Sequence, residues 1–275
     1  MNWQLIVQCL NLTLGIFLII KLFRLKLHKI YGLFCLFLMA DLFGSTLWLL
    51  SRVLGLFSNH FYIITWLVTR PIVWLFTLLM IYSLLGKILS HLPGLLRLSK
   101  RVLHVVFLSA TVLGLVSIRL EYSAPGFAAA LSRKQLLFRC WTTELVLDRV
   151  IISTALFSLV VILTFLLWFP VTIPRNLAVF SVGLSVYFAG GTVFLLLRSF
   201  WPDETLSIVS KLLGIVSVLL GGISSACFAF WLLLLSPAGE TVPSALTVQR
   251  QPQEQERLVA QLELINNALL KSARR

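Results

Sequence analysis

Seven long apolar runs constrain the fold of this chain more than any other feature of its sequence. A helix needs about 20 consecutive apolar residues to cross the hydrocarbon core of a bilayer. The runs cover residues 3–23, 31–57, 62–86, 102–120, 147–169, 177–197 and 208–235. We therefore expect an all-α integral membrane protein, in which residues 1–236 form a seven-transmembrane-helix bundle.

The composition excludes the main alternatives to a membrane protein. Hydrophobic residues make up 59% of the chain and charged residues 12%, about half the charged fraction of a typical soluble domain. Mean hydropathy is +0.97. These values leave too little polar surface for a soluble enzyme, and the abundance of apolar residues excludes a disordered chain.

The distribution of basic residues predicts the orientation of the bundle. Cytoplasmic loops of membrane proteins carry an excess of Lys and Arg. Here the cations gather after the first, third and fifth runs and after the seventh. They are Lys21, Arg24, Lys26 and Lys29, then Lys87, Arg97, Lys100 and Arg101, then Arg175, and finally Arg250, Arg257, Lys271, Arg274 and Arg275. The connection 119–146 is an exception, since it holds Arg119, Arg133, Lys134 and Arg139, but it also carries acidic residues, and long loops count for less. The pattern as a whole predicts an external N-terminus and a cytoplasmic C-terminus. The net charge of +13 is thereby explained by orientation in an anionic membrane, without a nucleic-acid partner.

One acidic residue, Asp41, lies well inside a predicted span. A charge at that depth costs at least ~2.5 kcal/mol and requires a partner. Arg70 in the third run is the natural candidate for a buried charge pair. The pair can simply fix two helices, or Asp41 can be protonated, or the two residues can form a ligand or proton site. Pro71 follows Arg70 directly and is a candidate hinge, although a proline kink also serves packing.

Residues 119–146 form the longest connection on the predicted outer side. The stretch 127–141 mixes apolar and basic residues and predicts an amphipathic helix at the membrane interface. This helix would act as a lipid anchor or as a lid over a pocket. Glu144, Asp148 and Arg149 follow, and we expect them to extend the fifth helix as a solvated face.

The chain changes character after residue 236. Residues 237–252 form a polar linker with three prolines, and residues 253–275 predict a cytoplasmic helix. Its apolar seam, at the spacing of a short coiled coil, consists of Leu258, Leu262, Ile265 and Leu269. Two and a half heptads are too short to be stable alone. The helix needs its copy in a homodimer, another protein, the bundle's cytoplasmic face or the membrane surface.

No residue pattern indicates a cofactor, a metal site or catalysis. The cysteines and histidines are scattered, without metal-ligand spacing. No nucleophile, base or metal set converges. Two small-residue patches, Gly190-Gly191 and Gly221-Gly222, are typical of helices that approach closely in lipid, with a flexible gate as the alternative.

Two stretches carry a resemblance to a known class of proteins. They are the basic-aromatic turn LKLHKIYGLFCLF over 25–37 and the tail LVAQLELINNALLKSARR over 258–275. With the seven-run layout, they resemble the seven-helix sensor regions of bacterial histidine kinases, and acidobacterial seven-helix membrane proteins that have no effector. The resemblance implies a bacterial inner-membrane location and a sensory role.

Three functions remain open. The protein can be an orphan sensor that relays a rearrangement of the bundle to a partner through its C-terminal helix. It can be a structural or assembly subunit of a membrane complex. It can also be a small transporter that uses Asp41. An enzyme is not expected.

Overall fold

A computed structural model describes residues 3–54, 59–90, 92–122, 133–168, 173–200, 207–241 and 252–272. These residues are helical almost throughout, and no β-strand occurs among them. The helices are α1 (Trp3–Arg24), η1 (Leu27–Lys29), α2 (Gly32–Leu54), α3 (Asn59–Ile88), α4 (Pro93–Tyr122), α5 (Arg133–Trp168), α6 (Arg175–Phe200), α7 (Ser207–Leu234), η2 (Pro237–Glu240) and α8 (Pro252–Ser272).

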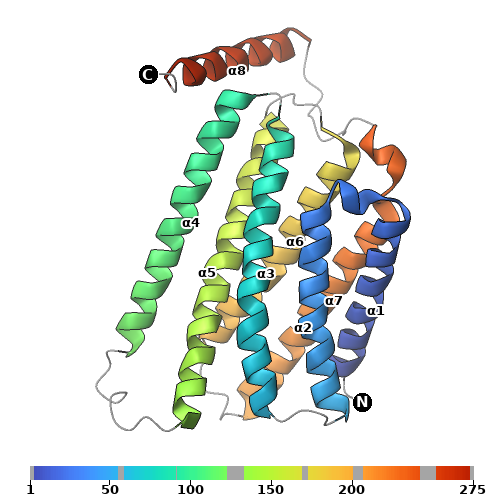
Figure 1. The fold of residues 1–275 in the computed structure, drawn as a ribbon, viewed down its shortest axis with the longest axis vertical. Helices are drawn as coiled ribbons and strands as arrows, with labels where there is room; N and C mark the ends of the chain where they lie inside the picture. The colour runs from blue at the N-terminus through green and yellow to red at the C-terminus, as the bar shows by residue number, and fades with distance from the viewer. Residues whose placement is uncertain are drawn as a thin grey trace.

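Seven of these helices run side by side as a bundle, and α8 lies across one end of it (Figure 1). Helix α1 packs on α2 and α7, α6 packs on α5 and α7, and α3 packs on α2 and α5. These contacts join six helices into a closed ring. Helix α4 lies outside the ring, packed mainly on α5, and its first turns contact α8.

Six helices within the described residues are long and apolar enough to cross a membrane. Their candidate spans are Trp3–Arg24, Gly32–Ser51, Ile64–Ile88, Thr143–Trp168, Arg175–Leu197 and Gly214–Leu234. Large apolar side chains cover their outward faces, as Phe17 and Phe43 do at 57% and 55% exposure. Lipid is the solvent that suits such a surface. The chain is therefore an all-α protein with the helices of a multi-pass membrane protein.

The predicted helix ends are wrong at α4 and α5. Arg97, Lys100 and Arg101 were expected in a connection, but α4 begins at Pro93 and includes them in its first turns. Proline suits the first turn of a helix because its missing N–H would have no partner there.

Helix α5 begins earlier still, at Arg133, and runs for 36 residues. Residues 133–141 are therefore continuous with the fifth helix and do not form a separate interfacial helix. The remainder of the predicted interfacial helix, 127–132, lies outside the described residues. At 1.5 Å per residue α5 is about 54 Å long, far more than a bilayer core requires.

The well-packed core lies in the half of the bundle nearer to α8. Its largest fully buried side chains include Phe37, Phe180 and Trp231. Aromatic rings meet across helices there: Phe34 lies 4.6 Å from Phe180 and 5.0 Å from Trp231 between ring centroids. This half is apolar and closely filled.

Candidate functional site: a polar cavity between six helices

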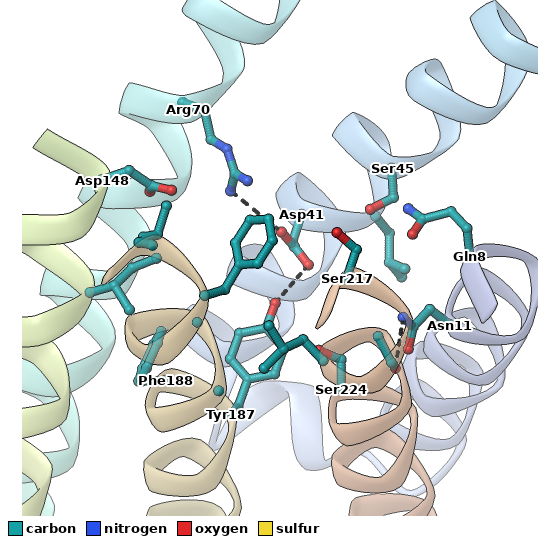
Figure 2. A pocket seen from close by; sticks show the side chains of 18 of the residues that line it. Gln8, Asn11, Asp41, Ser45, Arg70, Asp148, Tyr187, Phe188, Ser217 and Ser224 are labelled. Atoms are coloured by element: carbon teal, nitrogen blue, oxygen red, sulfur yellow. Dashed lines mark hydrogen bonds and ion pairs between the residues drawn. The ribbon is translucent and has the colours of Figure 1, made fainter. Parts of the chain in front are cut away.

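A cavity of about 430 Å³ lies between the six ring helices, in the half of the bundle remote from α8. Figure 2 shows polar side chains from several helices converging on it. The lining residues that matter most are Asn11 on α1, Asp41 and Ser45 on α2, Trp66 and Arg70 on α3, Asp148 on α5, Tyr187 on α6 and Gly221 on α7.

Small residues explain why this half holds a cavity. Gly190 and Gly191 on α6, with Ser217, Gly221 and Ser224 on α7, line the space where larger side chains would fill it. Gly221 also permits the close approach of α7 to α1, as the small-residue patch Gly221-Gly222 predicted. A Cβ there would lie 2.4 Å from Val7 Cγ1, and the Asn11 amide donates to the Gly221 carbonyl at 3.2 Å.

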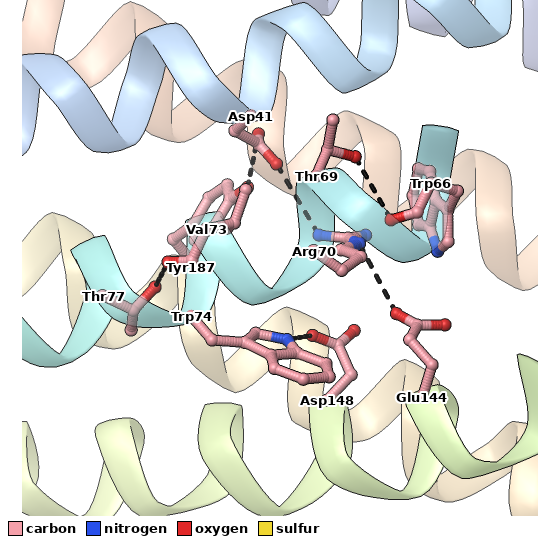
Figure 3. A network of polar contacts seen from close by, with 10 residues as sticks. All are labelled: Asp41, Trp66, Thr69, Arg70, Val73, Trp74, Thr77, Glu144, Asp148 and Tyr187. Atoms are coloured by element: carbon pink, nitrogen blue, oxygen red, sulfur yellow. Dashed lines mark hydrogen bonds and ion pairs between the residues drawn. The ribbon is translucent and has the colours of Figure 1, made fainter. Parts of the chain in front are cut away.

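Arg70 is the centre of a charged network beside the cavity (Figure 3). The structure brings the predicted pair together: Arg70 Nη1 lies 3.9 Å from Asp41 Oδ1. Arg70 Nε lies 3.8 Å from Glu144 Oε1. The guanidinium carbon also lies 4.0 Å from the centroid of the Trp66 ring. One cation therefore links α2, α3 and α5.

Hydrogen bonds orient the carboxylates of this network. The Tyr187 hydroxyl donates to Asp41 Oδ2 at 3.1 Å. The Trp74 indole N–H donates to Asp148 Oδ1 at 2.7 Å. Both donors come from a different helix than their acceptor, so the network fixes the relative positions of α2, α3, α5 and α6.

The prediction that Glu144 and Asp148 form a solvated face of the fifth helix is wrong. Glu144 and Asp148 are each only 4% exposed, because α5 begins about three turns before Glu144 and turns this face toward α3. Asp41 is consequently one of three acidic residues inside the candidate spans. Glu144, Asp148, Tyr187 and Trp66 are functional candidates that the sequence reasoning missed. The one-turn spacing of Glu144 and Asp148 was visible, but it is equally typical of an exposed helix face.

Arg70 and Asp41 lie well inside candidate spans, whereas Glu144 lies near the start of its span, Thr143–Trp168. Arg70 is six residues inside the span Ile64–Ile88, and Asp41 is ten residues from the end of the span Gly32–Ser51. At 1.5 Å per residue these positions lie roughly 9 Å and 15 Å inside the spans. Charges at such depth are retained mainly where they face a cavity or a partner.

Pro71, the predicted hinge, lies within α3, which continues through it as one helix from Asn59 to Ile88. Its ring is exposed on the outer face of the bundle. The proline leaves the Leu67 carbonyl without its usual helical donor.

A second polar cluster closes the opposite end of the bundle. We call it the Asn176 cluster; it consists of Tyr31, Asn176, Ser236 and Glu240. Asn176 is fully buried and donates to the Ser236 carbonyl at 2.7 Å and to Glu240 Oε1 at 2.5 Å. The Tyr31 hydroxyl donates to Glu240 Oε2 at 3.3 Å. Burial and the negative charge of Glu240 raise the pKa of Tyr31 above its ordinary value.

The C-terminal helix docks on the bundle itself. Asn266 of α8 is 9% exposed, and its side-chain oxygen accepts from the backbone N–H groups of Gly94 at 2.7 Å and Leu95 at 3.4 Å. These N–H groups belong to the first turn of α4, where no helical acceptor exists. A residue from the tail thus caps another helix.

The predicted coiled-coil seam is only partly the buried face of α8. Leu262 is buried at 6% exposure, whereas Ile265 is 49% exposed. Leu258 is half-buried, and the side chain of Leu269 lies outside the described residues. The positions that α8 buries are four residues apart: Leu258, Leu262 and Asn266. This spacing differs from that of a coiled coil because the helix packs against the first turns of α4 and not against an identical helix.

Within the described ranges, no three His, Cys, Asp or Glu side chains are placed to hold a metal ion together. The arrangement offers a partly open space lined by charges of both signs and by aromatic side chains.

Comparison with known proteins gives no relative: no family model, no curated protein and no solved structure matches this chain.

Proposed function

We propose that this protein is a ligand-binding sensor or regulatory protein of a bacterial inner membrane. It spans the membrane seven times, with the N-terminus outside and the C-terminus in the cytoplasm. A small polar ligand binds in the central cavity, and α8 carries the resulting change to a partner. The cavity is the observation that carries this proposal.

The positions of the basic residues and of α4 support this topology. Lys21, Lys87, Arg97 and Arg175 all lie at the α8 end of the bundle, which the positive-inside rule assigns to the cytoplasm. Helix α4 carries an aliphatic face at 49–69% exposure, suited to lipid, that consists of Val102, Val105, Leu108, Val112 and Val116.

The charge of the site favours a cationic ligand. Asp41, Glu144 and Asp148 surround a single guanidinium, so the fully ionised network has an excess of negative charge. The cavity wall also includes Trp66 and Tyr187, and aromatic faces attract cations. A small organic amine or quaternary ammonium group complements both features.

A continuous set of contacts supports a relay from the cavity to α8. Arg70 pairs with Glu144 on α5, α5 packs on α4, and the first turn of α4 is capped by Asn266 of α8. A ligand that competes for Arg70 or for its carboxylates changes how α3 holds α5. The change then reaches α8 through α4, the one bundle helix outside the ring.

Thiol labelling tests the cavity without knowledge of its natural ligand. In a background with the four native cysteines replaced by alanine, Ser45→Cys places a thiol in the cavity wall. We expect it to react roughly tenfold faster with the cationic trimethylammonium-ethyl methanethiosulfonate than with the anionic sulfonato-ethyl reagent, because the acid excess concentrates cations. Asp41→Asn should reduce this preference.

Ser90→Cys is the matched control, since Ser90 is exposed at the α8 end beside Lys87. It should show no preference for the cationic reagent. In intact cells the impermeant reagents should label Ser45→Cys and leave Ser90→Cys unlabelled. An anionic preference at Ser45→Cys would refute the cationic ligand, and labelling of Ser90→Cys from outside would refute the orientation.

The relay is tested by its reciprocity, because a ligand that changes the α4–α8 contact must itself be affected by that contact. Hydrogen exchange at Gly94 and Leu95 reports the cap. Labelling Ser45→Cys with the cationic reagent should accelerate exchange at these two amides, and Asn266→Ala should change the labelling rate at Ser45→Cys. If neither occurs, the cavity and α8 are uncoupled.

A small transporter is the second candidate, and one observation favours it. The polar cavity occupies one half of the bundle, while packed aromatic rings and the Asn176 cluster close the other. A transporter facing one side of the membrane has this asymmetry. Uptake of radiolabelled methylammonium into proteoliposomes, abolished by Asp41→Asn, would support it over the sensor.

A further inference from the structure

A second cavity of about 580 Å³ lies on the outer surface of the bundle, away from the polar cavity. It is a groove along the last turns of α1 that reaches α7 at Leu232. Its walls consist of Phe17, Ile20, Lys21, Arg24, Leu25 and Leu232. The groove combines two cations with an apolar floor at the α8 end of the candidate span Trp3–Arg24.

The two cations differ in how firmly they are held. The Lys21 ammonium donates to the Leu232 carbonyl, one of the last carbonyls of α7, which lack helical donors. This bond positions Lys21 and leaves two of its three donors for a ligand. Arg24 is exposed and forms no hydrogen bond or ion pair with the residues that the structure describes.

The stretch of sequence that carries these two cations contains no acidic residue. The first acidic residue of the sequence is Asp41, and Lys26 and Lys29 lie two and five residues after Arg24. Lys26 adopts a left-handed backbone conformation with a φ of 56°, so the chain turns sharply there and keeps these cations at one corner of the bundle. The corner carries a dense positive charge at the membrane boundary.

The apolar part of the groove points into the membrane. Phe17 lies about one turn before Lys21 and Ile20 directly before it, and they are 57% and 47% exposed. A molecule that contacts all four side chains needs a negative group at the boundary and a hydrocarbon chain below it. Phospholipids with anionic headgroups have this structure, and basic pockets at the cytoplasmic ends of membrane helices bind them.

We propose that this groove is a binding site for one anionic phospholipid. Its phosphate accepts hydrogen bonds from Arg24 and Lys21, and one acyl chain lies along Phe17 and Ile20. The site is independent of the polar cavity, because the two share no lining residue. The lipid joins α1 to the end of α7 and so stabilises the seam that closes the ring of helices.

Native mass spectrometry of the delipidated full chain in detergent tests this proposal. The protein is titrated with phosphatidylglycerol and with phosphatidylcholine of the same acyl chains. We expect one phosphatidylglycerol to bind at concentrations at which phosphatidylcholine does not. Arg24→Gln should weaken this binding about fivefold, the effect of removing one cation beside an anionic lipid.

Arg97→Gln is the matched control, because Arg97 is exposed at the same end of the bundle but lies on α4. It changes the net charge equally and should leave phosphatidylglycerol binding unchanged. Equal binding of the two lipids, or equal effects of the two variants, would overturn the site in favour of general surface attraction. Complete competition by soluble glycerol phosphate would also overturn it, since the acyl chain would then contribute nothing.

Discussion

The two halves of the bundle are built from the same apolar helices but differ in what occupies the space between them. Near α8, large aromatic and aliphatic side chains such as Phe34, Phe180 and Trp231 fill it. In the other half, glycines and serines leave a cavity, and Arg70 with its carboxylates lies beside it.

The difference shows how polar groups serve two purposes in one membrane bundle. The Asn176 cluster lies at the end of the helices and joins the chain after α7 to the starts of α2 and α6. Its members bond to one another. The Arg70 network lies inside the spans and surrounds a space that a ligand can enter. The following substitutions test whether these purposes are distinct.

The largest effect is expected from Arg70→Gln. It leaves Asp41 and Glu144 buried without their cation, and breaking such a pair costs about 3–5 kcal/mol. We expect a large loss of thermal stability in detergent, with the α8-end core affected only as a consequence of unfolding. The double variant Arg70→Gln/Asp41→Asn should recover part of the stability. No recovery would show that the pairing with Asp41 contributes little.

Asn176→Ala tests the opposite end. The fully buried amide donates to Ser236 and Glu240 and accepts from the Ser236 N–H at 3.3 Å, and removing it leaves buried polar groups without partners. We expect a loss of about 2–3 kcal/mol in the free energy of unfolding. Ser45→Cys labelling should keep its cationic preference. The control Asn267→Ala, at an exposed position of α8, should change stability by less than about 0.5 kcal/mol.

Substitutions at two adjacent glycines, Gly221 and Gly222, test how closely α7 packs on α1 at the cavity wall. An alanine at Gly221 would place its Cβ 2.4 Å from Val7 Cγ1, whereas nothing lies within 4 Å of a Cβ at Gly222. Overpacking at Gly221 should cost about 1–3 kcal/mol. Gly222→Ala should be neutral or slightly stabilising, because alanine favours a helix. Melting curves of the two variants give the comparison, and equal effects would refute close α1–α7 packing at Gly221.

The smallest effect is expected from Tyr31→Phe, which removes one hydrogen bond to Glu240, worth about 1 kcal/mol. The raised pKa of Tyr31 also predicts a pH dependence. The folded state favours the neutral phenol, so this stabilisation is present below the ordinary pKa of about 10 and is lost as the pH rises above it. The difference in stability between Tyr31→Phe and the unmodified protein should therefore shrink above pH 10. A constant difference would argue against this role.

The sequence by itself determined the helical class and the approximate position of six of the seven predicted spans, and it indicated Arg70 as a candidate partner for Asp41. Apolar runs of bilayer length admit few other structures, because every backbone polar group in lipid must be bonded within the segment. Asp41 and Arg70 lie well inside their runs, where a charge requires a partner, so the sequence indicates each as a candidate partner of the other. These inferences depend on composition and depth, which the linear sequence contains.

Only the tertiary structure decided where the remaining polar groups lie. Glu144 and Asp148 are buried because α5 extends beyond its apolar run and meets α3, and their spacing alone fits an exposed face equally well. Asn266 caps α4 and Asn176 bonds the chain after α7, each across a long separation in sequence. The sequence around an asparagine does not indicate which distant group its side chain will hydrogen-bond. The physical reason is that hydrogen bonds and charge pairs depend on distances of a few ångströms, which helix packing sets and periodicity does not.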